Sequence, residues 1–245
     1  MPYRRLPNTD SARLRALKSA LKKGKELPPF NLAYSQSTFT KVELFINSFE
    51  KAMANYKAAY NNQVEKNKEY QAAHKKARLY LSHFIQVLNM AIARGELPEK
   101  VREVYGMDID ERKLPSLATD KDLIDWGKRL INGETQRTSK GQSPITNPTI
   151  AVVKVRYENY VDAYNHQRIL QQNTARALTE LDSLRTKADE LILSIWNEVE
   201  DHFKDLSDDE RREHAKEYGL VYVYRKNELH GLQLLERSFT DFIKS

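Results

Sequence analysis

Two glutamate–histidine pairs are the residues whose types and spacing best suit a metal ion. Glu198 precedes His202 by four positions and Glu210 precedes His214 by four, so each pair shares one face of a predicted helix. A di-iron site in a helical bundle needs Glu-x-x-His on two helices, a spacing that none of the six histidines has. One pair supplies only two ligands. We therefore predict solvated helix pairs here, with no metal site and no cofactor.

Signatures of other catalytic classes are also absent from the sequence. The chain has no cysteine, which excludes disulfides, thiolate zinc sites and a cysteine nucleophile. Its eight glycines form no phosphate-binding loop, and no serine nucleophile elbow is present. No catalytic residue is predicted. An enzyme whose site forms at the helix ends, from residues distant in the sequence, stays open as the second alternative.

Positive charge is concentrated at the start of the chain. Residues 1–38 hold eight of the 40 basic residues and two of the 34 acidic ones, so they account for the whole net charge of +6. Such a segment attracts phosphate-rich polymers or an anionic membrane surface. The candidate nucleic-acid or anion-binding residues are Arg4, Arg5, Arg13, Arg15, Lys18, Lys22 and Lys23. The competing interpretation is a cap helix that docks through Leu14, Leu17 and Leu21 and leaves its charges in water.

Tyrosine is abundant, and tyrosines near basic residues can stack on single-stranded nucleic acid. The group in question is Tyr56, Tyr60, Tyr157, Tyr160 and Tyr164. Their heptad positions indicate the bundle core or a helix–helix seam instead, because aromatic rings dominate core packing. We therefore predict that these rings belong to the core.

Two long segments must position all of these residues. Residues 37–94 contain no Gly and no Pro and carry an apolar stripe with helical period, and a second stripe runs from a cap at Asn147 to about Phe203. Both stripes turn polar near their middle, at Asn61-Asn62 and at residues 171–173. A break there would give a four-helix bundle. We favour two continuous helices packed antiparallel, because neither place has turn chemistry.

The two long segments also resemble each other. Phe49-Glu50 matches Tyr157-Glu158 at an offset of 108 residues, and the match continues beyond the long helices. This predicts a tandem repeat whose copies bury each other's apolar stripes. The predicted divisions are a basic N-terminal arm over 1–37, repeat 1 over 38–133, a mobile linker over 134–147, and repeat 2 over 148–245, with both repeats packed as one body.

Short satellite elements complete the prediction of an all-α fold with two short strands. Thr9 or Asp10 caps a helix closed by Gly24, and Thr119 or Asp120 caps another that Gly133 ends. Ser207 and Glu210 have the spacing of a capping box. Residues 107–110 and 220–224 alternate like strands, and we expect them to pair with each other. A final helix carries Leu232, Leu235, Phe239, Phe242 and Ile243.

The opening of the chain resembles a bacterial protein family. It reads Met-Pro-Tyr-Arg-Arg-Leu-Pro-Asn-Thr-Asp over 1–10, Ala-Arg-Leu-Arg-Ala-Leu-Lys over 12–18 and Glu-Leu-Pro-Pro over 26–29. This stretch, about the first 35 residues, is similar to the start of a family of uncharacterised proteins from Bacteroidetes-type bacteria. The resemblance implies a bacterial cytoplasmic setting and assigns no functional residue. No apolar signal core or membrane span is found, which agrees with a cytoplasmic location.

Duplicated helices without catalytic signatures favour a non-enzymatic interaction or scaffold protein. We expect a protein partner or self-association. The first alternative is association with nucleic acid through the basic N-terminal arm.

Overall fold

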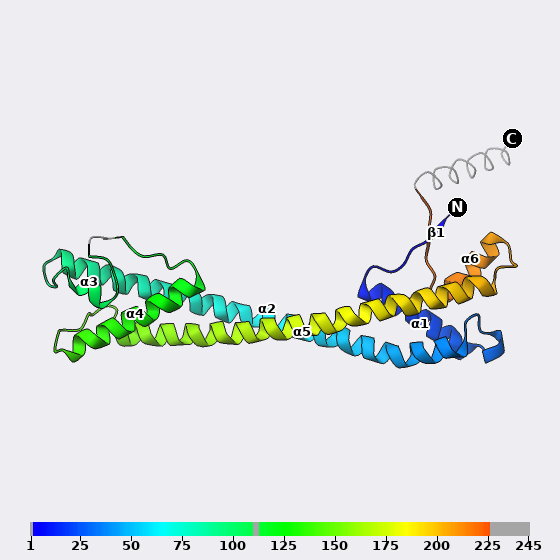
Figure 1. Ribbon diagram of the computed structural model, residues 1–245, viewed down its shortest axis with the longest axis horizontal. Helices are drawn as coiled ribbons and strands as arrows, with labels where there is room; N and C mark the ends of the chain where they lie inside the picture. The colour runs from blue at the N-terminus through cyan, green and yellow to red at the C-terminus, as the bar shows by residue number, and fades with distance from the viewer. Residues whose placement is uncertain (1, 110–112, 226–245) are drawn as a thin grey trace, which may run out of the picture. The chain divides into compact units, whose positions relative to one another are not determined.

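The computed structural model describes residues 2–109 and 113–225 and has the predicted all-α class, with one small sheet (Figure 1). The elements in chain order are β1 (Tyr3–Arg4), α1 (Asp10–Glu26), the 3-10 helix η1 (Pro29–Asn31), α2 (Gln36–Ala93), α3 (Val101–Val104), α4 (Asp120–Ser139), α5 (Ile150–His202), α6 (Asp208–Glu217) and β2 (Tyr222–Val223). The predicted final helix with Leu232, Leu235, Phe239, Phe242 and Ile243 lies outside the described residues.

The two long helices are continuous, as predicted. α2 has 58 residues and α5 has 53, and neither breaks at its polar middle. Asn61, Asn62 and residues 171–173 are exposed, so their side chains stay in water while the backbone hydrogen bonds of the helix are kept. Asn and Gln lower helix propensity by only about 0.7 kcal/mol or less per residue, which does not end a helix without a Gly or Pro.

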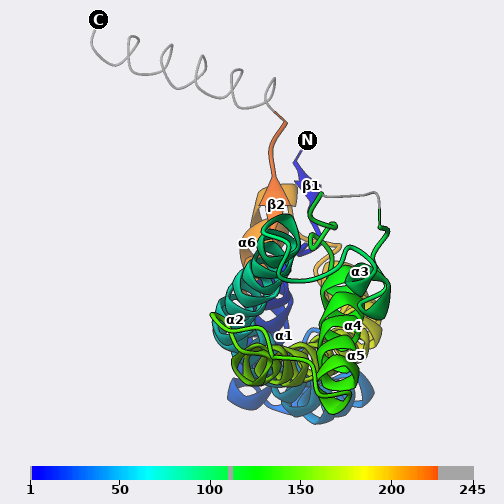
Figure 2. The ribbon, with the colours of Figure 1, turned by 90° about the vertical axis from the view of Figure 1, so that its left-hand side faces the viewer.

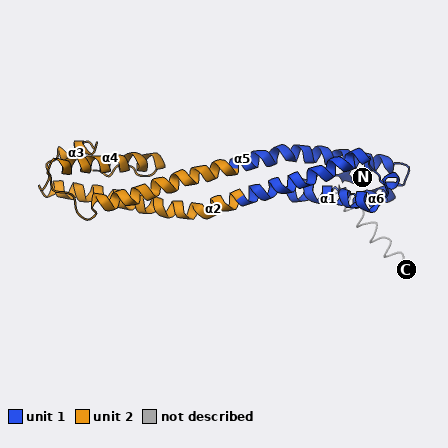
Figure 3. Cartoon of the chain, turned by 90° about the horizontal axis from the view of Figure 1, so that it is seen from below, with its two compact units in different colours: residues 1–58, 175–245 blue, residues 59–174 orange. Residues whose placement is uncertain are grey.

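The chain divides into two compact units, and each unit combines parts of both long helices (Figure 3). Unit 1 consists of residues 1–58 and 175–245, and unit 2 of residues 59–174. Neither unit coincides with a predicted repeat, and the duplication itself stays a prediction. Each unit has its own hydrophobic core.

Unit 1 contains α1, the first part of α2, the last part of α5, α6 and the sheet. The α2 and α5 segments run antiparallel (Figure 1). Thr9 accepts a hydrogen bond from the Ala12 amide and caps α1, as predicted. α1 buries Leu17 in a core that includes Phe49 and Trp196. The capping box of Ser207 and Glu210 starts α6, also as predicted.

Unit 2 contains the last part of α2, the first part of α5, α3 and α4. α3 lies against α4 (Figure 2), and α4 packs on α5, where the Tyr157 hydroxyl donates to the Ile124 carbonyl at 3.2 Å. Thr119 and Asp122 form a capping box at the start of α4. The core of this unit includes Leu88, Leu130 and other apolar side chains of α2, α4 and α5.

The predicted end of the α4 helix at Gly133 is wrong. α4 continues to Ser139, and a side chain at position 133 would have its Cβ 2.7 Å from the Val104 carbonyl oxygen. Glycine is therefore used here for close approach between α3 and α4, and not as a helix terminator. Residues 134–147 accordingly include a helical turn with Glu134 and Arg137 fully buried, in contrast to the mobile linker expected there. Gly24 likewise lies inside α1, which ends at Glu26.

The predicted strand pairing is also wrong. β2 lies within the predicted segment 220–224, but its partner is β1, in antiparallel register with Tyr3 opposite Val223 and Arg4 opposite Tyr222. Residues 107–109 are not a strand, and Asp110 lies outside the described residues. Over residues 2–109 and 113–225, no helix combines the length and the apolar composition that a membrane crossing requires.

Candidate functional site

The basic N-terminal segment is docked on unit 1 along its length. β1 pairs with β2, and the Arg5 amide donates to the Val221 carbonyl at 2.8 Å. α1 buries Ala16, Leu17 and Ala20 in the unit 1 core. The segment is therefore an integral part of unit 1, as the cap-helix interpretation expects for α1.

Carboxylates of the same unit pair with five of the seven predicted basic residues. The ion pairs are Arg4–Glu200 at 2.9 Å, Arg13–Asp189 at 2.7 Å, Lys18–Glu50 at 2.5 Å, Lys22–Glu26 at 3.7 Å and Lys23–Glu217 at 2.6 Å. These pairs neutralise much of the charge that composition alone assigns to the segment. They compete with any phosphate contact at the same side chains.

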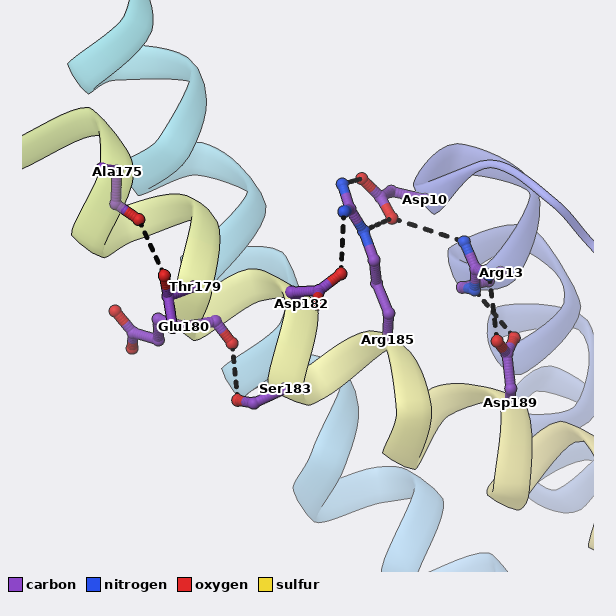
Figure 4. Close-up of polar contacts among 9 residues, drawn as sticks. All are labelled: Asp10, Arg13, Ala175, Thr179, Glu180, Asp182, Ser183, Arg185 and Asp189. Carbon is purple, nitrogen blue, oxygen red and sulfur yellow. Dashed lines mark hydrogen bonds and ion pairs between the residues drawn. The ribbon is translucent and has the colours of Figure 1, made fainter. Parts of the chain in front are cut away.

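The densest of these pairings joins α1 to α5 (Figure 4). The Arg13 guanidinium donates to both carboxylate oxygens of Asp189, at 2.7 and 2.9 Å, and Arg185 donates to both oxygens of Asp10, at 2.8 Å each. Arg13 also lies 3.6 Å from Asp10. The hydrogen bonds from Arg185 lower the pKa of the Asp10 carboxyl, and those to Asp189 raise the pKa of Arg13. This network fixes α1 on α5.

The other two predicted residues, Arg5 and Arg15, are exposed and have no ion pair within the described part of the chain. Both line one cavity of about 410 Å³ in unit 1, together with Lys216 of α6. Its apolar wall includes the buried Trp196 and Leu220 and the exposed Leu6 and Val221. The structure thus brings together two residues of the predicted anion-binding set and adds Lys216, which the sequence did not indicate.

A second hollow of unit 1 lies between α2 and α5. We call it the apolar groove; its volume is about 660 Å³, and it is lined by Thr38, Lys41, Leu44, Phe45, Lys187, Glu190, Leu191 and Ser194. Leu44 is 71% exposed, which is unusual for a large aliphatic side chain beside other apolar groups. The apolar groove therefore has the properties of a docking surface.

The two glutamate–histidine pairs serve other purposes. Glu198 accepts hydrogen bonds from the Ser35 amide at 2.6 Å and from the Thr38 hydroxyl at 2.7 Å, next to the start of α2. Burial raises the pKa of Glu198, but these hydrogen bonds outweigh it and leave the pKa lowered. Glu210 belongs to the α6 capping box, and the rings of His202 and His214 pack on Phe203. Among the described residues no cluster of three metal-ligating side chains is found.

The predicted tyrosine group lies largely in the cores. Tyr157 and Tyr160 are buried, and Tyr164 packs against the core of unit 2, with its ring tilted against that of Tyr70 at a centroid distance of 6.5 Å. Tyr56 packs on the core of unit 1. Tyr60 differs from the prediction, because 49% of its surface is exposed.

A carboxylate–tyrosine cluster in unit 2 was not found by sequence reasoning. The hydroxyls of Tyr70 and Tyr160 both donate to one oxygen of Asp120, at 2.6 and 2.7 Å, and His74 lies 3.9 Å from the same oxygen. Burial, with the nearby Asp120 carboxylate, raises the pKa of both tyrosines. The only signal in the sequence is the Thr119-Asp120 cap, which does not reveal the tyrosines that meet it.

A buried ion pair in the same unit was also missed. Glu134 and Arg137 are 0% and 1% exposed, and Arg137 Nη2 donates to Glu134 at 2.9 Å. The Tyr105 hydroxyl and the Ile145 amide donate to the same carboxylate. The i, i+3 spacing of Glu134 and Arg137 is visible in the sequence, but it usually marks an exposed pair.

Comparison of the chain with protein-family models, with curated proteins and with solved structures finds no match.

Proposed function

We propose that this chain is a non-enzymatic helical interaction protein that binds an amphipathic helix of a partner protein in the apolar groove of unit 1. The observation that carries the proposal is the exposure of Leu44, beside Phe45 and Leu191 in that groove. Covering apolar surface contributes roughly 25 cal/mol per Å² to association. We propose that this interaction takes place in a bacterial cytoplasm.

α1 shows how this pair of helices accepts a third helix. The apolar side of α1 enters the core, and its basic side chains pair with carboxylates of α2 and α5 on either side of it. Arg13 reaches Asp189 of α5, and Lys18 reaches Glu50 of α2. A basic helix thus lies on an acidic-flanked face of the α2–α5 pair.

The apolar groove lies on the opposite side of both long helices. Lys187 is two residues from Asp189, and Lys41 is nine residues from Glu50; at about 100° per residue, both spacings correspond to opposite sides of a helix. Both lysines are exposed. Among the residues that the structure describes, neither lysine has an ion pair, and Glu190 is the only acidic residue that lines the groove. Charge complementarity therefore favours a helix whose apolar face is flanked by carboxylates.

Photo-crosslinking in the native cell tests this proposal. A crosslinking amino acid is placed at position 44, and the matched control carries it at position 79, since Leu79 is also on α2, is 49% exposed and belongs to unit 2. We expect a discrete adduct from position 44 and none from position 79. Mass spectrometry of the adduct should identify a segment with apolar residues at helical spacing, flanked by Asp and Glu.

The purified partner then provides the quantitative test. We expect Leu44→Glu to weaken binding by about tenfold or more, because a charge enters an apolar contact, and Leu79→Glu to leave it unchanged. A partner segment without helical spacing, equal adducts from both positions, or no adduct would refute the proposal. Crosslinking of position 44 to a second copy of this chain would show that the groove mediates self-association and does not bind a partner protein.

A further inference from the structure

The cavity lined by Arg5, Arg15 and Lys216 has the chemistry of a second binding site, separate from the apolar groove. We propose that it binds a small organic phosphate monoester, with the phosphate on the three cations and a compact apolar body against the exposed Leu6 and Val221. A volume of about 410 Å³ suits a small ligand.

The charge of the cavity is the property that favours an anion. Three cationic side chains line it, and no Asp or Glu is among the described residues of its lining. Elsewhere in the same basic segment, six side chains have carboxylate partners. Within residues 2–109 and 113–225, Lys216 is the one of these three cations that has an ion pair, with Glu213 at 2.5 Å, and that pair is exposed to water. Like charges held together repel each other, and a bound anion removes this repulsion.

Three different elements hold these cations in place. Arg5 follows β1, and its backbone amide is bonded to Val221. Arg15 lies on α1, beside the buried Ala16, and Lys216 lies on α6, which contacts α1. Gly219 brings the chain after α6 against α1: its φ is +87°, and a Cβ there would lie 2.9 Å from the Ala16 carbonyl oxygen. The cavity is thus formed by packed backbone and not by a single loop.

The donor set favours phosphate over carboxylate. Guanidinium groups bind phosphate and carboxylate oxygens with two parallel hydrogen bonds, and an ammonium group adds a point charge. A phosphate monoester offers three oxygens and up to two negative charges, which suits three cations from three directions. Leu6 and Val221 of the apolar wall are 41% and 51% exposed, and they accommodate the rest of the ligand.

Tryptophan fluorescence provides a direct test, because the chain has two tryptophans and only Trp196 lines this cavity. In a Trp126→Phe background, phenyl phosphate should change the Trp196 emission saturably, and rising salt should weaken the binding. Benzyl alcohol, which has the same kind of apolar body without the charge, should produce no saturable change. Benzoate should bind more weakly than phenyl phosphate.

Charge variants locate the site. Arg5→Gln/Arg15→Gln should weaken phenyl phosphate binding by about tenfold or more, since two charge-assisted contacts are lost. The matched control is Arg78→Gln/Arg176→Gln, which removes two exposed arginines outside the cavity. The single variant Arg15→Gln should give an intermediate affinity and serves if the double variant is unstable. Absence of saturable binding, equal binding of benzoate, or equal loss in the control would overturn the proposal.

Discussion

Replacing Glu134 by Gln should destabilise unit 2 strongly. The Glu134 carboxylate is fully buried and accepts hydrogen bonds from Arg137 Nε at 3.0 Å, Arg137 Nη2 at 2.9 Å, the Ile145 amide at 2.8 Å and the Tyr105 hydroxyl. Gln keeps the shape but removes the charge, and its amide presents a donor where four donors already converge. Arg137 is left as a buried charge without a counter-ion.

The expected loss is about 3–5 kcal/mol in the free energy of unfolding, the usual cost of breaking a buried pair from one side. Arg137 Nη1 already has no hydrogen-bond partner, and the other acceptor that Arg137 has within the described residues is the neutral Tyr105 hydroxyl, 3.0 Å from Nε, which cannot replace the lost charge. Replacing both residues with apolar ones, as Glu134→Leu/Arg137→Met, should cost less than Glu134→Gln alone, because no charge then stays buried.

The effect should depend on pH with a defined sign. Burial raises the pKa of Glu134, but the hydrogen bonds from Arg137, Tyr105 and Ile145 outweigh it, so the net pKa is lowered. A lowered pKa stabilises the folded state above the unfolded pKa of about 4.3, and this contribution is lost as the pH falls through the folded pKa. The stability difference between wild type and Glu134→Gln should therefore be full at neutral pH and shrink below about pH 4.

Hydrogen exchange resolved by peptide is the suitable assay, because two compact units need not unfold together. Peptides from α4 should lose protection in Glu134→Gln, whereas peptides from α1 in unit 1 serve as the internal control. Urea unfolding followed by circular dichroism gives the total loss. A loss below about 1 kcal/mol, or a difference that does not change between neutral and acidic pH, would refute this account of the buried pair.

Two further predictions concern unit 2. Gly133→Ala should destabilise it, although alanine gains about 1 kcal/mol in helix propensity, because the new Cβ would lie 2.7 Å from the Val104 carbonyl oxygen; a raised melting temperature would contradict this. Tyr160→Phe should cost about 1–2 kcal/mol in urea unfolding, since Asp120 loses one hydroxyl donor but keeps Tyr70. An unchanged unfolding midpoint would show that this hydrogen bond contributes nothing net.

The long helices could be predicted from the sequence because periodicity and the absence of Gly and Pro are local signals. α2 begins and ends within one residue of the predicted 37–94. The strands could not be predicted in the same way. A strand of two residues is defined by its partner, and local alternation at residues 107–109 did not reveal that Tyr3 and Arg4 occupy the edge of β2.

The sequence predicts which basic residues are candidates for the site, but it does not predict which carboxylates pair with them. The sequence identifies the cations of the first 38 residues, but Arg13 and Asp189 are 176 positions apart, and no local pattern connects them. The same holds for Glu217, which pairs with Lys23 at 2.6 Å. Arg5 and Arg15 differ from the paired basic residues of this segment because the fold places no described carboxylate within ion-pair distance of them.

Both units anchor a shorter helix on the long helices, but the side chains that do so differ. In each, a helix that begins after a Thr N-cap precedes one of the long helices: Thr9 caps α1 in unit 1, and Thr119 caps α4 in unit 2. The first residue of that helix is an aspartate that binds side chains of long helices. Asp10 binds Arg185, whereas Asp120 binds Tyr70 and Tyr160. Since these aspartates bind through partners distant in the sequence, the Thr-Asp pattern marks where a helix begins but not what anchors it.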